Sequence, residues 1–120
     1  MISTILLILI LLQIKHWYID FVNQSEEEVK HKGIYLNWIG VKHSLKQGTG
    51  TMLCFIPFVY YPEVCVIFGL IDFILHYHID YCKMHWGNRD IKTPNFWAQL
   101  GLDQMAHQLT YIGLVYLITL

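Results

Sequence analysis

The stretch that decides the fold is "DFILHYHIDYCK", from Asp72 to Lys83. Its apolar residues, and those just before it, are typical of a membrane-spanning helix, yet it contains two Asp, two His and a Lys. A charged side chain that faces lipid costs about 3 kcal/mol or more. We therefore expect these groups to face other helices.

Helical geometry divides the ionisable groups of this stretch into two faces. In an α-helix, residues four apart in sequence lie about 40° apart around the axis. One stripe therefore carries Asp72, His76, Asp80 and Lys83. His78 lies on the opposite side and is expected to be a bystander.

The composition indicates an integral membrane protein with a single domain, residues 1–120. Of the 120 residues, 55% are hydrophobic and only 14% are charged, and the mean hydropathy is +0.40. A nucleic-acid-binding protein would need a basic face, which a net charge of −1 argues against.

Four hydrophobic segments predict the fold class, an all-α, integral membrane, up-down four-helix bundle. Their bounds are about 2–22, 34–61, 63–82 and 96–120. Each reaches the ~20 residues that cross a bilayer. The first lacks a positive n-region and a cleavage site, so we expect a retained anchor. Pro57 and Pro62 predict a tight turn between the second and third segments.

Positive charge predicts the topology. All eight Lys and Arg lie in or beside two connections, at Lys15, Lys30, Lys32, Lys42, Lys46, Lys83, Arg89 and Lys92. The positive-inside rule then places both connections in the cytoplasm and both termini outside, as in a multi-pass protein of a bacterial inner membrane. In the first connection, Ser25 and Glu28 predict the capping box of a short helix, and the glutamate run predicts a solvated surface.

This topology brings imidazoles and carboxylates from four segments to one level of the membrane. They are His16, Asp20, His43, His76, Asp80, Asp103 and His107. A single HxxxD pair would usually be a local hydrogen bond, but three His/Asp pairs with four-residue spacing favour a shared site. His and carboxylate ligands from facing helices are how bundles bind zinc, manganese or iron.

A divalent metal ion is the expected cofactor, with zinc first and manganese or iron as alternatives. The predicted ligands are His16, His43, His76, Asp80, Asp103 and His107. A tetrahedral zinc ion needs about four ligands. The excess suits either two metal ions or one ion whose His ligands are oriented by Asp side chains.

The order of these motifs, "HWYID", "KHS", "HYHIDYCK" and "LGLDQMAHQL", resembles a family of small bacterial and tailed-phage membrane proteins that is catalogued only as a domain of unknown function. The resemblance covers nearly the whole chain, and the compact length resembles its phage-encoded branch. It is carried by His16, Asp20, Gln24, Lys32, His43, His76, Asp80, Lys83, Asp103, Gln104 and His107. More distantly, the arrangement is similar to YdjM-like membrane-bound proteins, which are presumed metal-dependent hydrolases. The extra His78 is a departure from the family pattern.

The first functional hypothesis is an intramembrane metal-dependent hydrolase that acts on a membrane lipid, or a lipid-linked phosphate or ester, at the cytoplasmic headgroup level. One of Asp20, Asp80 and Asp103 is the expected general base. Lys83 and Lys32 are expected to hold an anionic headgroup. The expected positioning groups are Gln24 and Gln104.

The second hypothesis is not enzymatic. The His/Asp cluster would then be a structural site in a phage-encoded protein that binds a host membrane protein or forms a homo-oligomer. A transporter is a third hypothesis, which the nearly charge-free outer halves of the segments argue against.

Overall fold

The structure is a computed structural model that describes residues 2–120, and these form five α-helices, one π-helical segment and no strand. The elements are α1 (Ile2–Trp17), the π-helical segment η1 (Tyr18–Val22), α2 (Glu26–His31), α3 (Trp38–Phe55), α4 (Pro62–Trp86) and α5 (Pro94–Ile118). The all-α class predicted from the sequence is confirmed.

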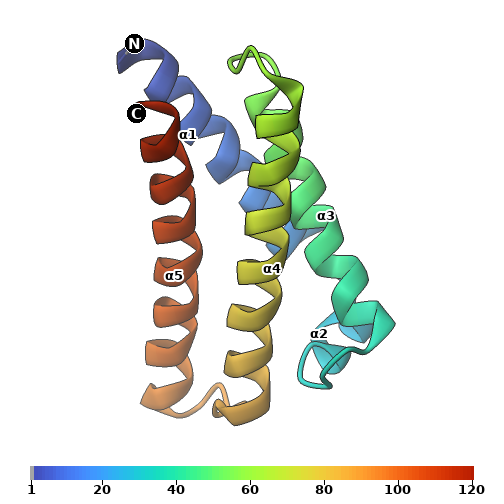
Figure 1. Cartoon of the computed structure of the whole chain (residues 1–120). Helices are drawn as coiled ribbons and strands as arrows, with labels where there is room; N and C mark the ends of the chain where they lie inside the picture. Colours follow the sequence, from blue (N-terminus) through green and yellow to red (C-terminus); the bar gives the residue numbers. More distant parts are fainter. Residues whose placement is uncertain (1) are drawn as a thin grey trace.

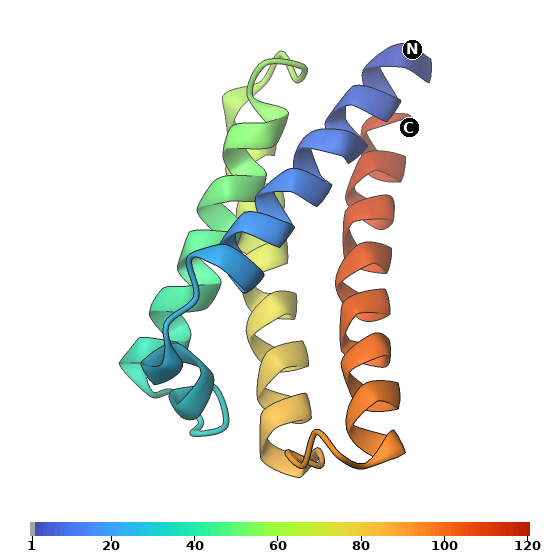
Figure 2. The ribbon, with the colours of Figure 1, turned by 180° about the vertical axis from the view of Figure 1, so that it is seen from behind.

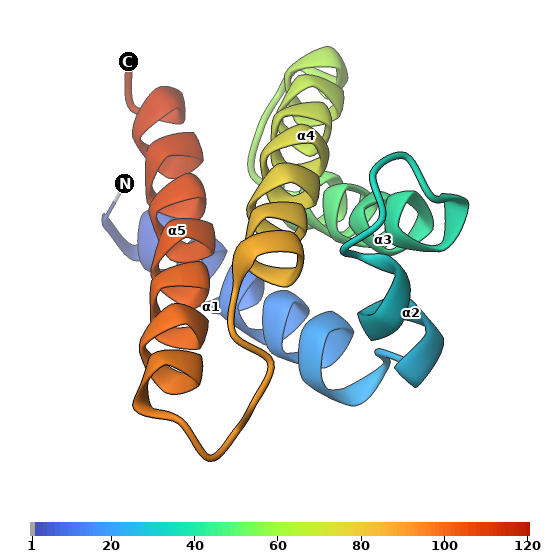
Figure 3. The ribbon, with the colours of Figure 1, turned by 90° about the horizontal axis from the view of Figure 1, so that it is seen from below.

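The four long helices contact one another in a closed ring. α1 packs against α3 and α5, and α4 packs against the same two helices from the other side. Both termini lie at the end that carries the α3–α4 turn (Figure 1). The short α2 and the α4–α5 connection lie at the opposite end, and α1 crosses the molecule obliquely in the view from behind (Figure 2). Seen from below, α2 lies beside α3 and the end of α1 (Figure 3).

α3 is shorter than the expected 34–61 segment, because local signals end the helix early on both sides. The Asn37 side chain accepts a hydrogen bond from the Ile39 backbone N–H at 3.0 Å, which caps the start of the helix. At the other end the helix stops at Phe55, two residues before Pro57, which cannot donate a backbone hydrogen bond.

The first segment is not a continuous α-helix. After Trp17 the chain winds into the π-helical turn η1, and the Asn23 N–H bonds the Tyr18 carbonyl at 2.8 Å. A π turn holds an extra residue, so it changes the direction in which the following side chains point. Asp20 lies within this turn, so the π-helical winding sets the direction in which the buried Asp20 side chain points.

The packing is inverted relative to a water-soluble protein. Among residues 2–120, more of the buried residues are polar or charged than apolar. The outer faces instead expose large apolar side chains, among them Leu6, Ile10, Ile67, Leu70, Ile74, Met105, Leu109 and Ile112. Two helical stretches are long and apolar enough to cross a membrane, Ile2–Val22 and Pro62–Trp86.

The interior has two layers. The end that carries the termini is filled by an apolar core, made of Ile8, Leu12, Phe55, Cys65, Phe68, Tyr111, Leu114 and Val115. The buried His and Asp residues lie further along the same helices, toward α2 and the α4–α5 connection.

A pair of glycines lets α3 and α4 approach closely. A Cβ atom added to Gly48 would lie 2.6 Å from the Gly69 carbonyl oxygen, and one added to Gly69 would lie 2.8 Å from the Gly48 carbonyl oxygen. Only a residue without a side chain fits either position, so this contact fixes the depth at which the two helices cross.

Candidate metal centre

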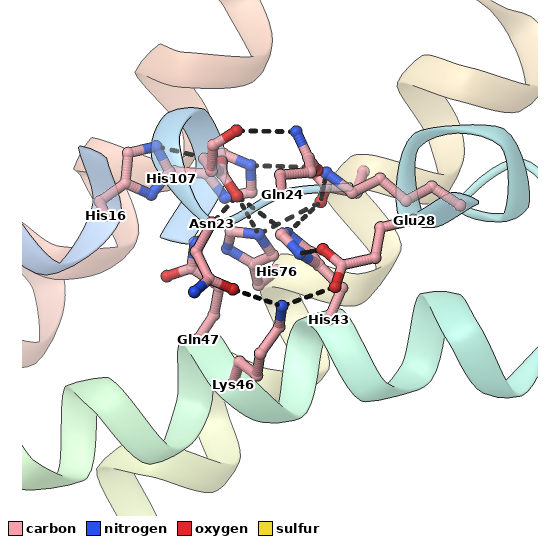
Figure 4. A network of polar contacts seen from close by, with 12 residues as sticks. His16, Asn23, Gln24, Glu28, His43, Lys46, Gln47, His76 and His107 are labelled. Carbon is pink, nitrogen blue, oxygen red and sulfur yellow. Dashed lines mark hydrogen bonds and ion pairs between the residues drawn. The ribbon is translucent and has the colours of Figure 1, made fainter. Parts of the chain in front are cut away.

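The predicted His and Asp residues gather in one buried cluster. α1 and η1 contribute His16 and Asp20, and α3 contributes His43. The other members are His76 and Asp80 of α4 and Asp103 and His107 of α5, and each of the seven residues is 5% exposed or less. The cluster therefore joins all four long helices (Figure 4).

Four side chains direct ligand atoms toward a common point: Asp20, His43, His76 and Asp80, whose ligand atoms all lie within 4.8 Å of one another. His43 Nε2 is 2.8 Å from Asp20 Oδ1 and 3.6 Å from Asp80 Oδ2. His76 Nε2 is 3.2 Å from Asp80 Oδ2 and 3.6 Å from Asp20 Oδ1. We call these four residues the first ligand set.

A second ligand set consists of Asp80, Asp103 and His107. His107 Nε2 lies 3.1 Å from Asp80 Oδ1 and 3.6 Å from Asp103 Oδ1. The His107 ring stacks on the His76 ring of the first set, with the ring centroids 4.0 Å apart. Asp80 thus belongs to both sets and presents a different oxygen to each.

Several ligand atoms in these sets are buried without a hydrogen-bond partner in the described residues. They include His76 Nε2 and Asp103 Oδ1. A buried polar atom left without a partner costs about 1–3 kcal/mol, so a native structure rarely leaves several together. The donor set of imidazole nitrogens and carboxylate oxygens fits a divalent cation, which would bind these atoms directly.

Glu28 orients His43, although the glutamate run is expected on a solvated surface. That prediction is wrong for Glu28, which is buried because its carboxylate turns inward. His43 Nδ1 donates to Glu28 Oε2 at 2.9 Å, and Lys46 Nζ donates to Glu28 Oε1 at 2.6 Å (Figure 4). With its proton on Nδ1, a neutral His43 ring has an acceptor at Nε2, and this atom faces the Asp20 carboxylate, which is also an acceptor. A second proton on the ring or a metal ion must therefore lie between these two atoms.

The hydrogen bonds to Glu28 also affect its titration. Burial alone would raise the pKa of the Glu28 carboxyl, but the hydrogen bonds from Lys46 and His43 outweigh burial and lower it. Ser25 caps α2 as expected, since its Oγ accepts from the Glu28 N–H at 3.2 Å. The predicted capping box is only half formed, because the Glu28 carboxylate turns to His43 and Lys46. No sequence signal links Glu28 to a histidine fifteen residues further along, because the two meet only through the fold of the connection.

Lys32 places a positive charge directly beside the cluster. It is 5% exposed, and its Nζ lies 2.9 Å from Asp80 Oδ2. Burial would lower the pKa of the Lys32 ammonium, but the carboxylates of Asp80 and Asp20 outweigh burial and raise it. Lys32 therefore remains charged and partly balances the aspartates.

His16 lies outside both ligand sets, although it was predicted as a ligand. Both ring nitrogens have other contacts, Nδ1 with the Tyr111 hydroxyl at 2.9 Å and Nε2 with Gln104 Oε1 at 2.7 Å. Its Nε2 is also 3.4 Å from Asp20 Oδ2. His16 is thus placed to hold Asp20 and Gln104 in position.

The predicted positioning groups and Lys83 surround the aspartates. Gln24 Nε2 donates to the Asp20 carbonyl oxygen at 2.7 Å, within η1. Gln104 Nε2 donates to Asp103 Oδ2 at 3.0 Å, and Lys83 Nζ is 3.5 Å from the same oxygen. Asp103 therefore presents Oδ2 toward Lys83 and Oδ1 toward His107.

His78 points away from the cluster, as its helical phase predicts. It is exposed, its Nδ1 bonds the Ile74 carbonyl at 2.8 Å, and its Nε2 lies 3.0 Å from the Tyr35 hydroxyl.

Lys15 and Asp72 form a second buried polar group, and the sequence does not predict their pairing. Lys15 was assigned to the charge of the first connection, but its Nζ turns inward to lie 3.3 Å from Asp72 Oδ2. Lys15 also donates to Gln47 Oε1 at 2.7 Å, and Gln47 Nε2 donates to Asp20 Oδ1 at 2.9 Å. Asp72 is therefore connected to the first ligand set through two side chains.

A groove opens beside the second ligand set, between α4 and α5. Its volume is about 480 Å³, and Lys83 and Asp103 are part of an otherwise largely apolar lining. A smaller cavity of about 250 Å³ shares Lys83 with it and is also lined by Lys30 and Arg89. An apolar groove thus adjoins a cationic cavity at the level of the cluster.

Comparison with known protein families gives a match over most of the chain. The model of a family described as "Protein of unknown function (DUF3307)" matches residues 7–120. No curated protein and no solved structure matches the chain.

Proposed function

Because the chain belongs to the DUF3307 family, whose description gives no function, we propose from its own residues that it is a membrane-embedded metal-dependent hydrolase acting on a lipid-linked phosphate or ester. The observation that carries the proposal is the convergence of buried, unpartnered His and Asp ligand atoms beside a groove lined by apolar groups and Lys83.

The inverted packing supports the proposed membrane setting. Apolar side chains on the outer faces and ionisable groups inside suit a four-helix bundle whose solvent is lipid. The positive charges at one end support an orientation with α2 and the α4–α5 connection in the cytoplasm of a bacterial cell and both termini outside.

The metal ion would be held by the first ligand set, Asp20, His43, His76 and Asp80. Two imidazoles and two carboxylates suit zinc, with manganese or iron as alternatives. When bound, such an ion supplies Lewis acidity that polarises a phosphoryl or acyl oxygen.

Asp103 is the carboxylate best placed to act on substrate, because it alone of the three candidate bases lines the groove. The oxygen of a water molecule forms the new bond to phosphorus or to the carbonyl carbon, and the bond to the leaving oxygen breaks. Asp103 Oδ2 takes the proton of that water and returns it to the leaving oxygen. Lys83, 3.5 Å from the same Oδ2, holds an anionic substrate oxygen.

The metal claim is tested by elemental analysis of the detergent-purified protein. We expect bound zinc in the wild type, strong loss of it in His76→Ala, and full retention in His78→Ala, which removes an exposed His from the same helix. Absence of metal from the wild type, or full metal content in His76→Ala, would reject the proposed metal site.

The activity is tested with lipid phosphates and phosphodiesters in mixed micelles, following release of phosphate or of the free lipid alcohol. We expect turnover by the zinc-loaded wild type, loss of at least tenfold in Asp103→Asn, and no loss in Asp90→Asn, whose side chain is exposed. Turnover that survives Asp103→Asn would reject the catalytic role of this residue.

A second candidate function is structural, because the first ligand set already provides four protein ligands and could hold an ion with no position for substrate. The protein would then act by binding a host membrane component or a second copy of itself. Full metal occupancy without turnover on any lipid phosphate or ester would favour this candidate.

A further inference from the structure

The two oxygens of Asp80 point in different directions. Oδ2 is 3.2 Å from His76 Nε2 in the first ligand set, and Oδ1 is 3.1 Å from His107 Nε2 in the second. A carboxylate that presents one oxygen to each of two nitrogen ligands has the arrangement of a bridge between two metal ions. We infer that the centre binds two divalent ions, with Asp80 as the bridging ligand and the second ion facing the groove.

The spacing of the two histidines agrees with two ions. The rings of His76 and His107 stack with their centroids 4.0 Å apart, and the ions of two-metal hydrolytic sites lie about 3.5–4 Å apart. The two rings are inclined by 23°. Their Nε2 atoms face different oxygens of Asp80 and are therefore directed to neighbouring positions and not to the same one. One ion would leave either His107 or His76 without a metal contact.

The two sets differ in the number of ligands, and this assigns different roles to the two ions. The first has four protein ligands and is complete for a tetrahedral ion. The second has three, namely Asp80, Asp103 and His107. Three protein ligands with one position left for water or substrate is the pattern of catalytic sites, and Asp103 lines the groove from which substrate would enter.

The charge of a two-ion centre also narrows the substrate class. Two divalent ions, Lys32 and Lys83 would carry six positive charges against the three negative charges of Asp20, Asp80 and Asp103. A phosphate monoester, which carries about two negative charges at pH 7, offsets most of this excess of three. With one ion the excess is one, and a singly charged phosphodiester would suit the site better. A lipid phosphate monoester, with its chain in the groove and its phosphate near Lys83, is the substrate that the two-ion centre fits.

This inference rests on the metal binding of the proposed function, and counting ions tests the two separately. Wild-type protein loaded with zinc or manganese and freed of excess metal should hold two ions per chain. Asp103→Asn should hold one, and Asp90→Asn should hold two. One ion in both the wild type and Asp103→Asn would overturn the two-ion centre while leaving the proposed function in place, and no ion in the wild type would overturn both.

Manganese loading provides a second readout that does not depend on a variant that folds well. Two bridged Mn²⁺ ions in the wild type should give an exchange-coupled electron paramagnetic resonance spectrum. His107→Gln, which removes a ligand of the second set only, should give the six-line spectrum of an isolated ion. A six-line spectrum from fully loaded wild-type protein would overturn the inference. Hydrolysis of a lipid phosphate monoester at least tenfold faster than of the matching diester is expected, and the reverse preference would reject the substrate class.

Discussion

At the scale of single residues, the buried pair of Lys15 and Asp72 shows how the interior tolerates charge. The Asp72 side chain is fully buried and that of Lys15 is 7% exposed. Thr51 donates to Asp72 at 2.5 Å, and Lys15 reaches the Tyr111 hydroxyl at 2.9 Å. Each charge therefore has an opposite charge and neutral partners, without which its burial would be very costly.

Removing the charge of Asp72 should destabilise the protein strongly. In Asp72→Asn, Lys15 would remain buried without its counter-charge, and breaking a buried pair in this way costs about 3–5 kcal/mol. The free energy of unfolding, measured in mixed micelles, should fall by this amount. Asp90→Asn, at an exposed position, should change it by less than about 0.5 kcal/mol. A loss below about 1 kcal/mol in Asp72→Asn would mean that Lys15 is not held as described.

Glu28 offers a test in which the pH dependence has a definite sign. Its pKa in the folded protein is lowered from the ordinary value of 4.5, so its contribution to stability is present above that value and is lost as the pH falls through the lower, folded-state pKa. Glu28→Gln should therefore cost about 1.5–3 kcal/mol at pH 7, the size of a hydrogen bond to a charged group. The difference from wild type should shrink steadily below pH 4.5.

The matched control for this experiment is Glu27→Gln, since the Glu27 side chain is 64% exposed. It should show little effect at any pH. A difference between wild type and Glu28→Gln that grows on acidification would contradict the assignment of Glu28 as an ionised partner of His43 and Lys46.

At the scale of elements, the sequence predicts the helices better than their internal irregularities. Apolar runs and the positions of proline show where helices lie, because both act locally. The π turn at Tyr18–Val22 is invisible in the sequence, since nothing in "YIDFV" disfavours an ordinary α-helix. Tertiary contacts select it: Asp20 in this turn accepts from His43 and Gln47 of α3.

The glycine contact between α3 and α4 should be sensitive to any added side chain. Gly69→Val would place atoms against the Gly48 carbonyl, and the helices would have to separate. We expect a loss of about 3 kcal/mol or more in stability, in the upper range for overpacking, together with lower zinc occupancy because His43 of α3 would move away from His76 and Asp80 of α4. Thermal unfolding and metal content measure both effects.

Gly113→Val is the control for this substitution, because no atom lies within 4 Å of a Cβ atom at that position on α5. It should leave the metal content unchanged. Equal losses in the two variants would indicate a general intolerance of valine in these helices and not a specific contact.

At the scale of the whole molecule, the sequence predicts at which level along the helices the site lies, but not how its side chains are arranged. Spacing alone shows that the His/Asp pairs share a depth and a face, and the structure brings six of the seven predicted residues into two ligand sets. The exclusion of His16 depends on the rotation of α1 relative to α5, which places Gln104 and Tyr111 next to its ring. Helical periodicity contains no information about that rotation.

The arrangement of the two ends predicts the topology in a cell. Ser25→Cys, before α2, and Asn88→Cys, before α5, should react with a membrane-impermeant maleimide only after the membrane is opened, because both lie at the positively charged end. Tyr60→Cys in the α3–α4 turn should react on intact spheroplasts. The experiment requires a background in which the three native cysteines, Cys54, Cys65 and Cys82, are replaced. Labelling of all three sites from one side would contradict a membrane-spanning arrangement.

The apolar core at the end that carries the termini has an electrical consequence. Leu12, Phe55 and Leu114 are fully buried or nearly so and lie between the polar cluster and that end. In the proposed orientation, this core separates the ionisable cluster from the outer face of the membrane, so protons and ions that reach the cluster from the cytoplasm meet apolar side chains on its far side. A cell can then hold many copies of the protein without dissipating its membrane potential, and ionisable groups can work at membrane depth without forming a leak.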